Sequence, residues 1–391
     1  MCLLGQFATL AIDGWSNLTN DPVVGISLTT KGKTCLIDAV DTTGQMHTTE
    51  YMTELTSNAI TKAEELYDVN IGHVVTDGAS NMKGMRNKIK ETLDRDIITY
   101  HCQPHLLNLL AKDVKDEQTV TVKRVTAVLK FFRNKHSAKA KLKELNVNTP
   151  PLPAETRWNT LRDSLAYYCE NWATLVQIIA DLQGTNGTER KFLENVQIRS
   201  SARDLLAIFD AITAAINRLQ SDTATIAEAV ESWLELIETI GNMDNPTVSN
   251  EVKIRSEEML VDPAFLAANL LDHRYLGKRL TSQQMTEATK YITDKDPEAA
   301  EPLTLLLAGV APYDSKALSV KVDPQIWWVA GKRLGYHGSL CKVALHLTSA
   351  VANSAGLERQ FSTLKFTYGS LRTNLGVEKA GKLAFCYLNQ Q

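Results

Sequence analysis

The stretch FATLAIDGWSNLTNDPVVGISLTTKGKTCLIDAV, residues 7–40, decides the fold of this chain. It holds three apolar runs, and the first of them ends in an acid, Asp13, that is followed by Gly. The second and third runs are joined at Lys31-Gly32-Lys33, and a short glycine-containing connection between two such runs is a hairpin signal. The start of the chain is therefore predicted to form three strands, of which the last two make a hairpin.

The residues that follow alternate between helix and strand. An apolar stripe predicts a helix from about Thr48 to Tyr67. The run IGHVVTDGASNM, residues 71–82, predicts a buried strand that ends in Asp77, again followed by Gly. The pattern continues with a helix over 83–96, a strand over 97–102 and a helix over 104–114. Three strands, helix, strand, helix, strand, helix is the order of a ribonuclease H-like core.

A long helical segment follows. From about Val120 to Gly338 apolar residues recur at helical spacing, alternation of the β type is nearly absent, and prolines punctuate the helices. We therefore predict an α/β fold: a ribonuclease H-like core, with a mixed five-stranded sheet and flanking helices, interrupted by a large all-α insertion. The predicted parts are residues 1–119 for the first part of the core, 120–338 for the insertion and 339–391 for the C-terminal part of the core.

Composition narrows the class of protein. The chain of 391 residues is 44% apolar and 22% charged, as in a soluble globular protein, and its net charge of −3 requires a local basic surface or a separate module for any DNA binding. Its six cysteines are scattered without paired spacing, which favours a reducing compartment, cytosol or nucleus. The first residues lack the basic start of a signal peptide, and no uncharged run reaches the roughly 18 residues of a membrane helix.

Asp13 and Asp77 occupy matching places, each at the end of an apolar strand and before Gly. In an open α/β sheet, sites form beyond the carboxyl ends of strands. If the two strands are parallel neighbours, the carboxylates lie side by side, and a divalent cation would relieve their repulsion. The alternative is that each Asp only ends its strand with an Asx turn.

A third acid lies in LTSAVANSAGLERQFSTL, residues 347–364. Five residues of this stretch follow one another at steps of three and four, which predicts that they lie on one face of a helix: Leu347, Val351, Ser354, Glu358 and Phe361. An inward-facing Glu358 needs a partner, because a buried unpaired carboxylate is destabilising. That partner is an Arg elsewhere, a hydrogen-bond network or a metal ion shared with Asp13 and Asp77. Three carboxylates and two Mg²⁺ ions roughly 3.5–4 Å apart suit phosphodiester chemistry.

Two further stretches hold candidate binding residues. CQPH places Cys102 and His105 three apart after a strand, which is either half of a zinc site or, as we favour, a buried thiol and a hydrogen-bonded His beside the acids. Arg157 and Trp158 have two interpretations. Either Arg157 binds a phosphate while Trp158 stacks on an unpaired base, or Arg157 is a solvated side chain and Trp158 lies in the core. The small basic stretches LLDHRYLGKRL (270–280) and LKFTYGSLR (364–372) are interpreted as solvated faces.

Together these stretches resemble the hAT superfamily of DNA transposases, in order and over nearly the whole chain. The matching pieces are LAIDGWSN, VVTDGASNM, CQPHLLNL, TRW, ANLLDHRYLG and SAGLERQFSTL followed by LRTNLGVEKAGKLAFCYLN. The resemblance implies a DDE triad of Asp13, Asp77 and Glu358 that binds Mg²⁺ or Mn²⁺. It also implies that Cys102, His105, Arg157 and Trp158 position the DNA and a flipped base.

The resemblance further implies transposon-end DNA as the partner, a homodimer or higher oligomer formed through residues 361–389, no membrane, and a location in the nucleus. The N-terminal BED-type zinc finger usual in the family is not seen, since no cluster of Cys and His precedes Asp13. The stretch before Glu358, AVANSAGLER, is looser than the usual run of small residues and Ser.

Three functions follow as hypotheses. The first is a transposase, or a protein derived from one, that cuts and joins DNA strands. The second is a domesticated or decayed copy that dimerises and associates with nucleic acid without catalysis. The third is a ribonuclease H-like nuclease unrelated to transposition, which the long helical insertion before Glu358 disfavours.

Overall fold

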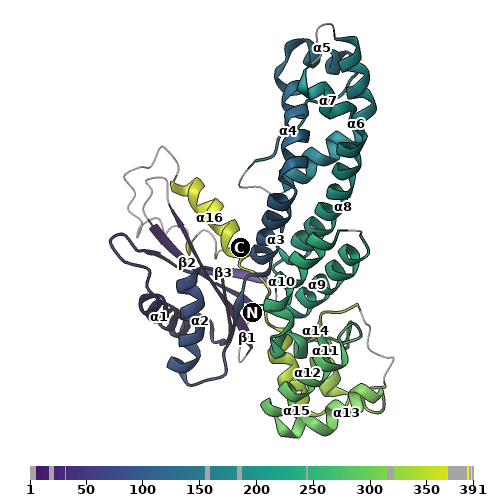
Figure 1. Cartoon of the computed structure of the whole chain (residues 1–391). Helices are drawn as coiled ribbons and strands as arrows, with labels where there is room; N and C mark the ends of the chain where they lie inside the picture. Colours follow the sequence, from purple (N-terminus) through teal and green to yellow (C-terminus); the bar gives the residue numbers. More distant parts are fainter. Residues whose placement is uncertain are drawn as a thin grey trace. The chain divides into compact units, whose positions relative to one another are not determined.

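The computed structural model describes residues 6–16, 22–30, 32–154, 159–182, 187–243, 245–314, 321–368, 385–386 and 389. Five strands form one sheet (Figure 1): β1 (Phe7–Ser16), β2 (Pro22–Thr30), β3 (Lys33–Asp41), β4 (Asn70–Thr76) and β5 (Ile98–His101). Their order is β3-β2-β1-β4-β5. The pairs β3-β2 and β2-β1 are antiparallel, whereas β1-β4 and β4-β5 are parallel. This is the mixed sheet of a ribonuclease H-like core, as predicted.

Helices flank the sheet and make up the long region after β5. They are α1 (Thr49–Tyr67), α2 (Ser80–Leu93), α3 (Gln103–Glu117), α4 (Thr119–Asn134), α5 (His136–Glu144), α6 (Asn159–Asp181), α7 (Thr188–Glu194), α8 (Val196–Leu219), α9 (Ile226–Gly241), α10 (Pro246–Leu260), α11 (Pro263–Leu271), α12 (Ser282–Lys295), the 3-10 helix η1 (Pro297–Ala299), α13 (Ala300–Ala308), α14 (Pro324–Arg333), α15 (Gly338–Thr348) and α16 (Ala355–Tyr368). Within the described ranges, no helix is both long and apolar enough to cross a membrane.

The predicted hairpin is confirmed. β2 and β3 pair antiparallel up to Thr30 and Lys33, and Gly32 between them has a φ of 70°. A positive φ is open to glycine without steric strain, because glycine has no Cβ. The described cysteines, which are Cys35, Cys102, Cys169, Cys341 and Cys386, are free thiols.

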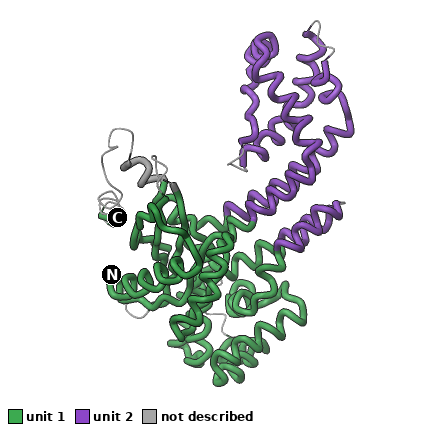
Figure 2. Tube along the Cα trace, turned by 60° about the vertical axis from the view of Figure 1, so that its left-hand side comes forward, with its two compact units in different colours: residues 1–106, 218–234, 256–391 green, residues 107–217, 235–255 purple. Residues whose placement is uncertain are grey.

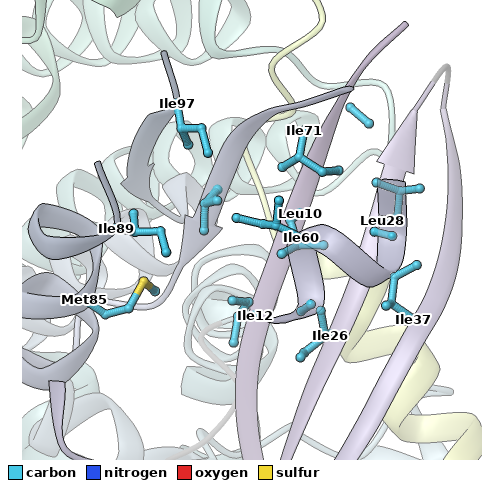
Figure 3. Packing of buried hydrophobic residues seen from close by; sticks show 14 of the residues in the cluster. Leu10, Ile12, Ile26, Leu28, Ile37, Ile60, Ile71, Met85, Ile89 and Ile97 are labelled. Atoms are coloured by element: carbon cyan, nitrogen blue, oxygen red, sulfur yellow. The ribbon is translucent and has the colours of Figure 1, made fainter. Parts of the chain in front are cut away.

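One face of the sheet packs on α1 and α2, and we call it the α1/α2 face. Alternate residues of β1 point to it, and Leu10 and Ile12 join a cluster that includes Ile60 of α1 and Met85 of α2 (Figure 3). Each fully buried side chain of this size contributes about 1.5–3 kcal/mol relative to an exposed one. The Thr48 side chain caps α1 by accepting a hydrogen bond from the backbone N–H of Tyr51 at 3.2 Å.

The other face receives residues 346–361, and we call it the C-terminal face. The Thr9 hydroxyl of β1 accepts a hydrogen bond from the backbone N–H of Val351 at 3.0 Å. The Tyr100 hydroxyl of β5 donates to the Val351 carbonyl at 2.8 Å. The backbone N–H of Gln103 donates to the Ala352 carbonyl at 3.0 Å. The end of the chain thus returns to the strands formed at its start.

The prediction of one helix face across residues 347–361 is wrong. α15 ends at Thr348 and α16 begins at Ala355, and the residues between them bond to other segments. The Ala350 carbonyl accepts from the N–H of Ile226 at 3.0 Å, and the N–H of Ala352 donates to the Ala224 carbonyl at 2.8 Å. These contacts with a distant segment replace the hydrogen bonds that a continuous helix would form, and tertiary contacts often override helical periodicity in this way.

The chain divides into two compact units (Figure 2). The unit that holds the sheet comprises residues 1–106, 218–234 and 256–391, and the second comprises 107–217 and 235–255. Helices α11 to α15 therefore belong to the same unit as the sheet, and α4 to α7 belong to the second. The domain boundaries predicted near residues 119 and 338 stay a prediction.

Candidate active site

Asp13 and Asp77 lie next to each other on neighbouring strands. β1 and β4 are parallel and pair Ile12 with Thr76, so the two acids follow at the same level. Since side chains alternate along a strand and Ile12 points to the α1/α2 face, both acids belong to the C-terminal face. One detail of the prediction is wrong: β1 continues to Ser16, because its other edge goes on pairing with β2, where Asp13 lies opposite Gly25.

Both acids accept a hydrogen bond from a nearby backbone N–H, and that of Asp77 forms an Asx turn after its strand. The N–H of Gly14 donates to Asp13 Oδ1 at 2.8 Å, and the N–H of Ala79 donates to Asp77 Oδ1 at 3.1 Å. The predicted structural role, an Asx turn at the end of a strand, is therefore found for Asp77 but not for Asp13, because β1 continues past Asp13 to Ser16. It does not exclude a second role, since an ionised carboxylate has two oxygens and about four acceptor positions.

Three carboxylates interact at this end of the sheet. Burial is the largest cause that raises the pKa of Asp13 to about 7, and the charges of Asp77 and then Glu358 raise it further, whereas the hydrogen bond from Gly14 lowers it. Like charges disfavour ionisation of a neighbour when they are close to it. Asp13 therefore lies within electrostatic reach of both other acids, although Glu358 is separated from it by more than 300 residues of sequence.

Glu358 reaches this place from the first turn of α16, but its side chain is exposed, so the prediction that it faces inward is wrong. The reason is the new start of the helix at Ala355, which turns Leu357 and Phe361 toward the sheet. Desolvation still raises the pKa of Glu358 above its ordinary value, and Arg359 opposes that shift. Because the side chain is exposed, solvent screens much of this effect.

A glycine lets α16 approach the sheet. A Cβ placed on Gly25, the partner of Asp13 in the sheet, would lie 2.3 Å from Cε1 of Phe361 and 3.1 Å from Cδ1 of Leu357. The rings of Trp15 and Phe361 lie 4.1 Å apart between centroids. The Asp222 carboxylate forms an ion pair with Arg359 on the same helix. These contacts fix the helix that carries Glu358 beside the strand that carries Asp13.

Cys102 supports the start of α16. Its thiol is 1% exposed and accepts a hydrogen bond from the N–H of Ser354 at 3.5 Å, and burial raises its pKa to about 11. A protonated, enclosed thiol is neither a good metal ligand nor a surface for DNA. The predicted buried thiol beside the acids is thus found, and its contact explains the position: it holds the turn that precedes Glu358.

His105, the partner of Cys102 in the sequence pattern, is half-buried. Its ring lies 5.4 Å from that of His101 between centroids. Burial, and then the proximity of His101, lower the pKa of His105, whereas the charge of Asp77 raises it. A hydrogen bond of the His105 ring was predicted, but within the described part of the chain its ring makes none. It is a neutral imidazole near Asp77.

Arg86 is a residue of this site that we did not predict. It is buried on α2, and its Nη1 donates to the Asp77 carbonyl at 2.7 Å and to the Thr76 hydroxyl. Burial lowers its pKa, and the charges of Glu258 and Asp77 oppose that shift. The signal in the sequence was a charged residue within the apolar stripe of α2, beside Met82, Met85 and Ile89.

His101 and Gly78 complete the surroundings of Asp77. A Cβ on Gly78 would lie 2.5 Å from Cε1 of His101, so glycine is required for this close packing. His101 Nδ1 lies 3.7 Å from the Glu258 carboxylate. The His101 ring thus packs against Gly78, and Arg86 bonds to the carbonyl of Asp77 just before it.

Other predicted residues are not gathered here. Arg157 and Trp158 lie outside the described residues, and so does most of the segment 361–389. Asn389 is described, and its side-chain amide exchanges two hydrogen bonds with the backbone of Leu36 in β3, at 3.0 and 2.9 Å. The stretch around Arg274 is not a solvated face as interpreted, because Arg274 pairs with the fully buried Asp272 at 2.6 Å.

The donor set of Asp13 and Asp77 fits a divalent cation. Mg²⁺ typically uses one or two protein carboxylates and completes its shell with water and phosphate oxygens. Burial, and then the charges of Asp77 and Glu358, raise the pKa of Asp13, and a bound cation would favour its ionised form. In the described parts of the chain, however, no three His, Cys, Asp or Glu side chains are grouped to hold a metal ion, so Glu358 is not gathered with the pair into one ligand cluster.

Comparison with known proteins gives one family match, at the start of the chain. Residues 6–132 match the family model described as a domain of unknown function, DUF659, which is associated with hAT transposase-like proteins. No curated protein matches the chain. The match covers the sheet, Asp13 and Asp77. A DUF659 domain on a ribonuclease H-like sheet fits a transposase-like protein.

Proposed function

We propose that the chain is a hAT-type transposase, or a protein derived from one, that cuts and joins DNA strands at the acids Asp13, Asp77 and Glu358. The observation that carries the proposal is that Asp13 and Asp77 follow at the same level of parallel neighbouring strands and that Glu358, from a C-terminal helix, lies within electrostatic reach of Asp13. Burial first, and then the charges of Asp77 and Glu358, raise the pKa of Asp13 to about 7. A fold gains nothing in stability by gathering like charges. Their arrangement favours a site for a cation and a phosphodiester.

Each residue has a role in this proposal. Asp13 and Asp77 would hold Mg²⁺ or Mn²⁺, and Glu358 would join them when its side chain turns toward the pair. Such ions, when bound, activate an attacking oxygen and stabilise a leaving one. Arg86 holds the backbone of Asp77 in place, and Cys102 holds the start of α16. Because ligands must be deprotonated, metal binding would weaken as Asp13 takes up a proton below about pH 7.

The proposed partner is transposon-end DNA. His105 is placed near Asp77, where it would contact the nucleic acid, and Arg157 with Trp158 would hold the flanking nucleotide. Assembly through residues 361–389 as a homodimer and a location in the nucleus belong to the same proposal.

The second candidate is a non-catalytic copy that associates with nucleic acid. The exposed side chain of Glu358 favours it, together with the lack of a grouped three-ligand cluster in the described ranges. In that case Asp77 would keep only the turn that it forms with Ala79, and Asp13 only the hydrogen bond from Gly14.

Calorimetric titration of the full chain with Mn²⁺ separates the two candidates. The transposase proposal expects binding that is lost in Asp13→Asn and weakened in Glu358→Gln, whereas the control Glu301→Gln, an exposed acid on α13, should bind like wild type. Fused to an end-binding domain, the wild-type chain should nick DNA with Mg²⁺ or Mn²⁺, and the first two variants should not. Cutting that survives either substitution would overturn the mechanism, and absence of any carboxylate-dependent Mn²⁺ site would favour the scaffold.

A further inference from the structure

A short part of the second unit carries an unusual charge. Residues 119–145 contain eight Lys and Arg and a single acid, Glu144, whereas the rest of the chain contains 34 Lys and Arg and 44 Asp and Glu. The segment forms two consecutive helices, α4 and α5 (Figure 1). A basic segment in a chain of net charge −3 is a local feature that overall composition conceals.

Both helices bury their apolar sides and expose their charges. The buried side chains of this pair are Val122, Val125, Val128, Leu129 and Phe132 on α4 and Ala138 and Leu142 on α5. The exposed cations are Lys123, Arg124, Lys130, Arg133, Lys135, Lys139 and Lys143. We call these seven residues the α4–α5 basic surface.

Within the described ranges, no ion pair joins these seven charges to an acidic side chain. Among residues that the structure describes, the one ion pair of the segment joins Lys141 to Glu144 at 2.8 Å. Arg133 instead donates to the Pro150 carbonyl at 2.7 Å, and Lys135 lies 5.0 Å from the centre of the Phe131 ring. The basic surface therefore repels itself, and binding of a polyanion would relieve that repulsion.

A cavity lies beside the basic residues of α5. A cavity of about 620 Å³ lies between α5 and residues 146–149, and His136, Lys139 and Lys143 line it together with the amides Asn146 and Asn148. The three α5 residues follow steps of three and four, so they share one helix face. His136 and Lys143 are seven residues apart, which corresponds to a rise of about 10 Å along the helix.

We infer that the α4–α5 basic surface binds the phosphodiester backbone of nucleic acid, without reading its sequence. Several cations along two helices can each meet a phosphate, because duplex DNA carries a charge for every ~1.7 Å of its axis. A lipid surface does not fit, since a membrane-bound helix needs an exposed apolar face and both apolar faces are buried here. The inference rests on charge and shape in the second unit, and not on the acids of the proposed active site.

Fluorescence anisotropy tests the inference with the full chain and a labelled duplex of arbitrary sequence, in EDTA so that no cutting occurs. The variants are Lys139→Gln/Lys143→Gln and Lys123→Gln/Lys130→Gln, and the matched control is Lys112→Gln/Lys191→Gln, which removes the same charge from exposed sites of the same unit. Each basic-surface variant should lower the slope of log K against log salt by about 2, at about 0.9 per lost phosphate contact. It should also bind at least ~10-fold more weakly at low salt, while the control keeps the wild-type slope.

Equal binding by the variants and the control would overturn the inference. So would a wild-type chain that binds polyglutamate but not the duplex, because the partner would then be an acidic protein. Circular dichroism melting of each variant checks that these exposed substitutions leave the fold intact. Because the assay contains EDTA and the substituted lysines lie apart from Asp13, Asp77 and Glu358 in the sequence, a failure of the proposed catalytic function leaves this result unaffected.

Discussion

The two faces of the sheet are built by alternate residues of the same strands, yet they differ in almost every respect. On the α1/α2 face, Leu10 and Ile12 of β1 pack in an apolar cluster whose members all come from residues 8–97. On the C-terminal face, the same strand presents Thr9 and Asp13, whose neighbours include residues from the end of the chain.

The difference shows that one face of the sheet stabilises the fold, whereas the other carries the groups that could take part in chemistry. The apolar face buries carbon against carbon, and its contacts form between elements that are close in sequence. The C-terminal face buries polar and ionisable groups, and its partners arrive only after residues 346–361 fold back. The first face holds the sheet together, so that the second can hold acids close to one another at a cost in stability.

The largest effect is expected from a substitution that disrupts the apolar cluster of the α1/α2 face. Leu10→Ala should lower the free energy of unfolding by about 2–5 kcal/mol, because it removes a fully buried side chain and leaves a cavity. Urea unfolding followed by circular dichroism measures this change. Leu66→Ala is the control, since Leu66 of α1 is 54% exposed and should change stability by less than ~0.5 kcal/mol. Similar effects of both substitutions would contradict the assigned core.

A smaller effect is expected on the C-terminal face from Gly25→Ala. The new methyl group would lie 2.3 Å from the Phe361 ring, and α16 must shift to make room. Overpacking of this kind costs about 1–3 kcal/mol, and the shift should also weaken Mn²⁺ binding by moving Glu358. Calorimetry and urea unfolding measure the two effects.

Two further variants test whether the effects of Gly25→Ala come from its contact with Phe361. Adding Phe361→Leu to Gly25→Ala should restore part of both losses, because it removes the ring that the methyl group meets. Gly338→Ala should change neither quantity, since a Cβ there meets nothing within 4 Å. Mn²⁺ binding that is unchanged in Gly25→Ala would show that the position of α16 does not control the site.

The same contrast explains what the sequence could predict. The order of strands and helices, the hairpin at Gly32 and the neighbouring acids Asp13 and Asp77 depend on local patterns, and the structure has them. The approach of Glu358 to these acids was predicted from its place on an apolar helix face and from the family resemblance, while its predicted inward orientation is wrong. Helical spacing over 347–361 could not reveal that Ala350 and Ala352 bond to a segment near residue 225. Arg86 escaped prediction for a similar reason, because its partner is a backbone carbonyl that no pattern shows.

The smallest expected effect is on the pH dependence of stability, and it arises from a buried histidine on the C-terminal face. His73 of β4 is fully buried, and its ring lies 4.8 Å from that of His346 between centroids. Burial, and then the proximity of His346, lower the pKa of His73 well below its ordinary value. The unfolded chain therefore takes up a proton more readily, so His73 supports stability above about pH 6.5 and this support is lost as the pH falls further.

His73→Phe should therefore flatten the decline of the melting temperature between about pH 6.5 and pH 5, as differential scanning calorimetry measures. The slope is the informative quantity, because the substitution also changes packing. Asp13 acts in the opposite sense, since its raised pKa of about 7 means that stability falls as the pH rises from about 4 to 7, and the difference between variant and wild type isolates the histidine. His337→Gln at an exposed site should leave the slope unchanged. An equal slope in His73→Phe and wild type would show that protonation of this buried pair does not limit the stability of the C-terminal face.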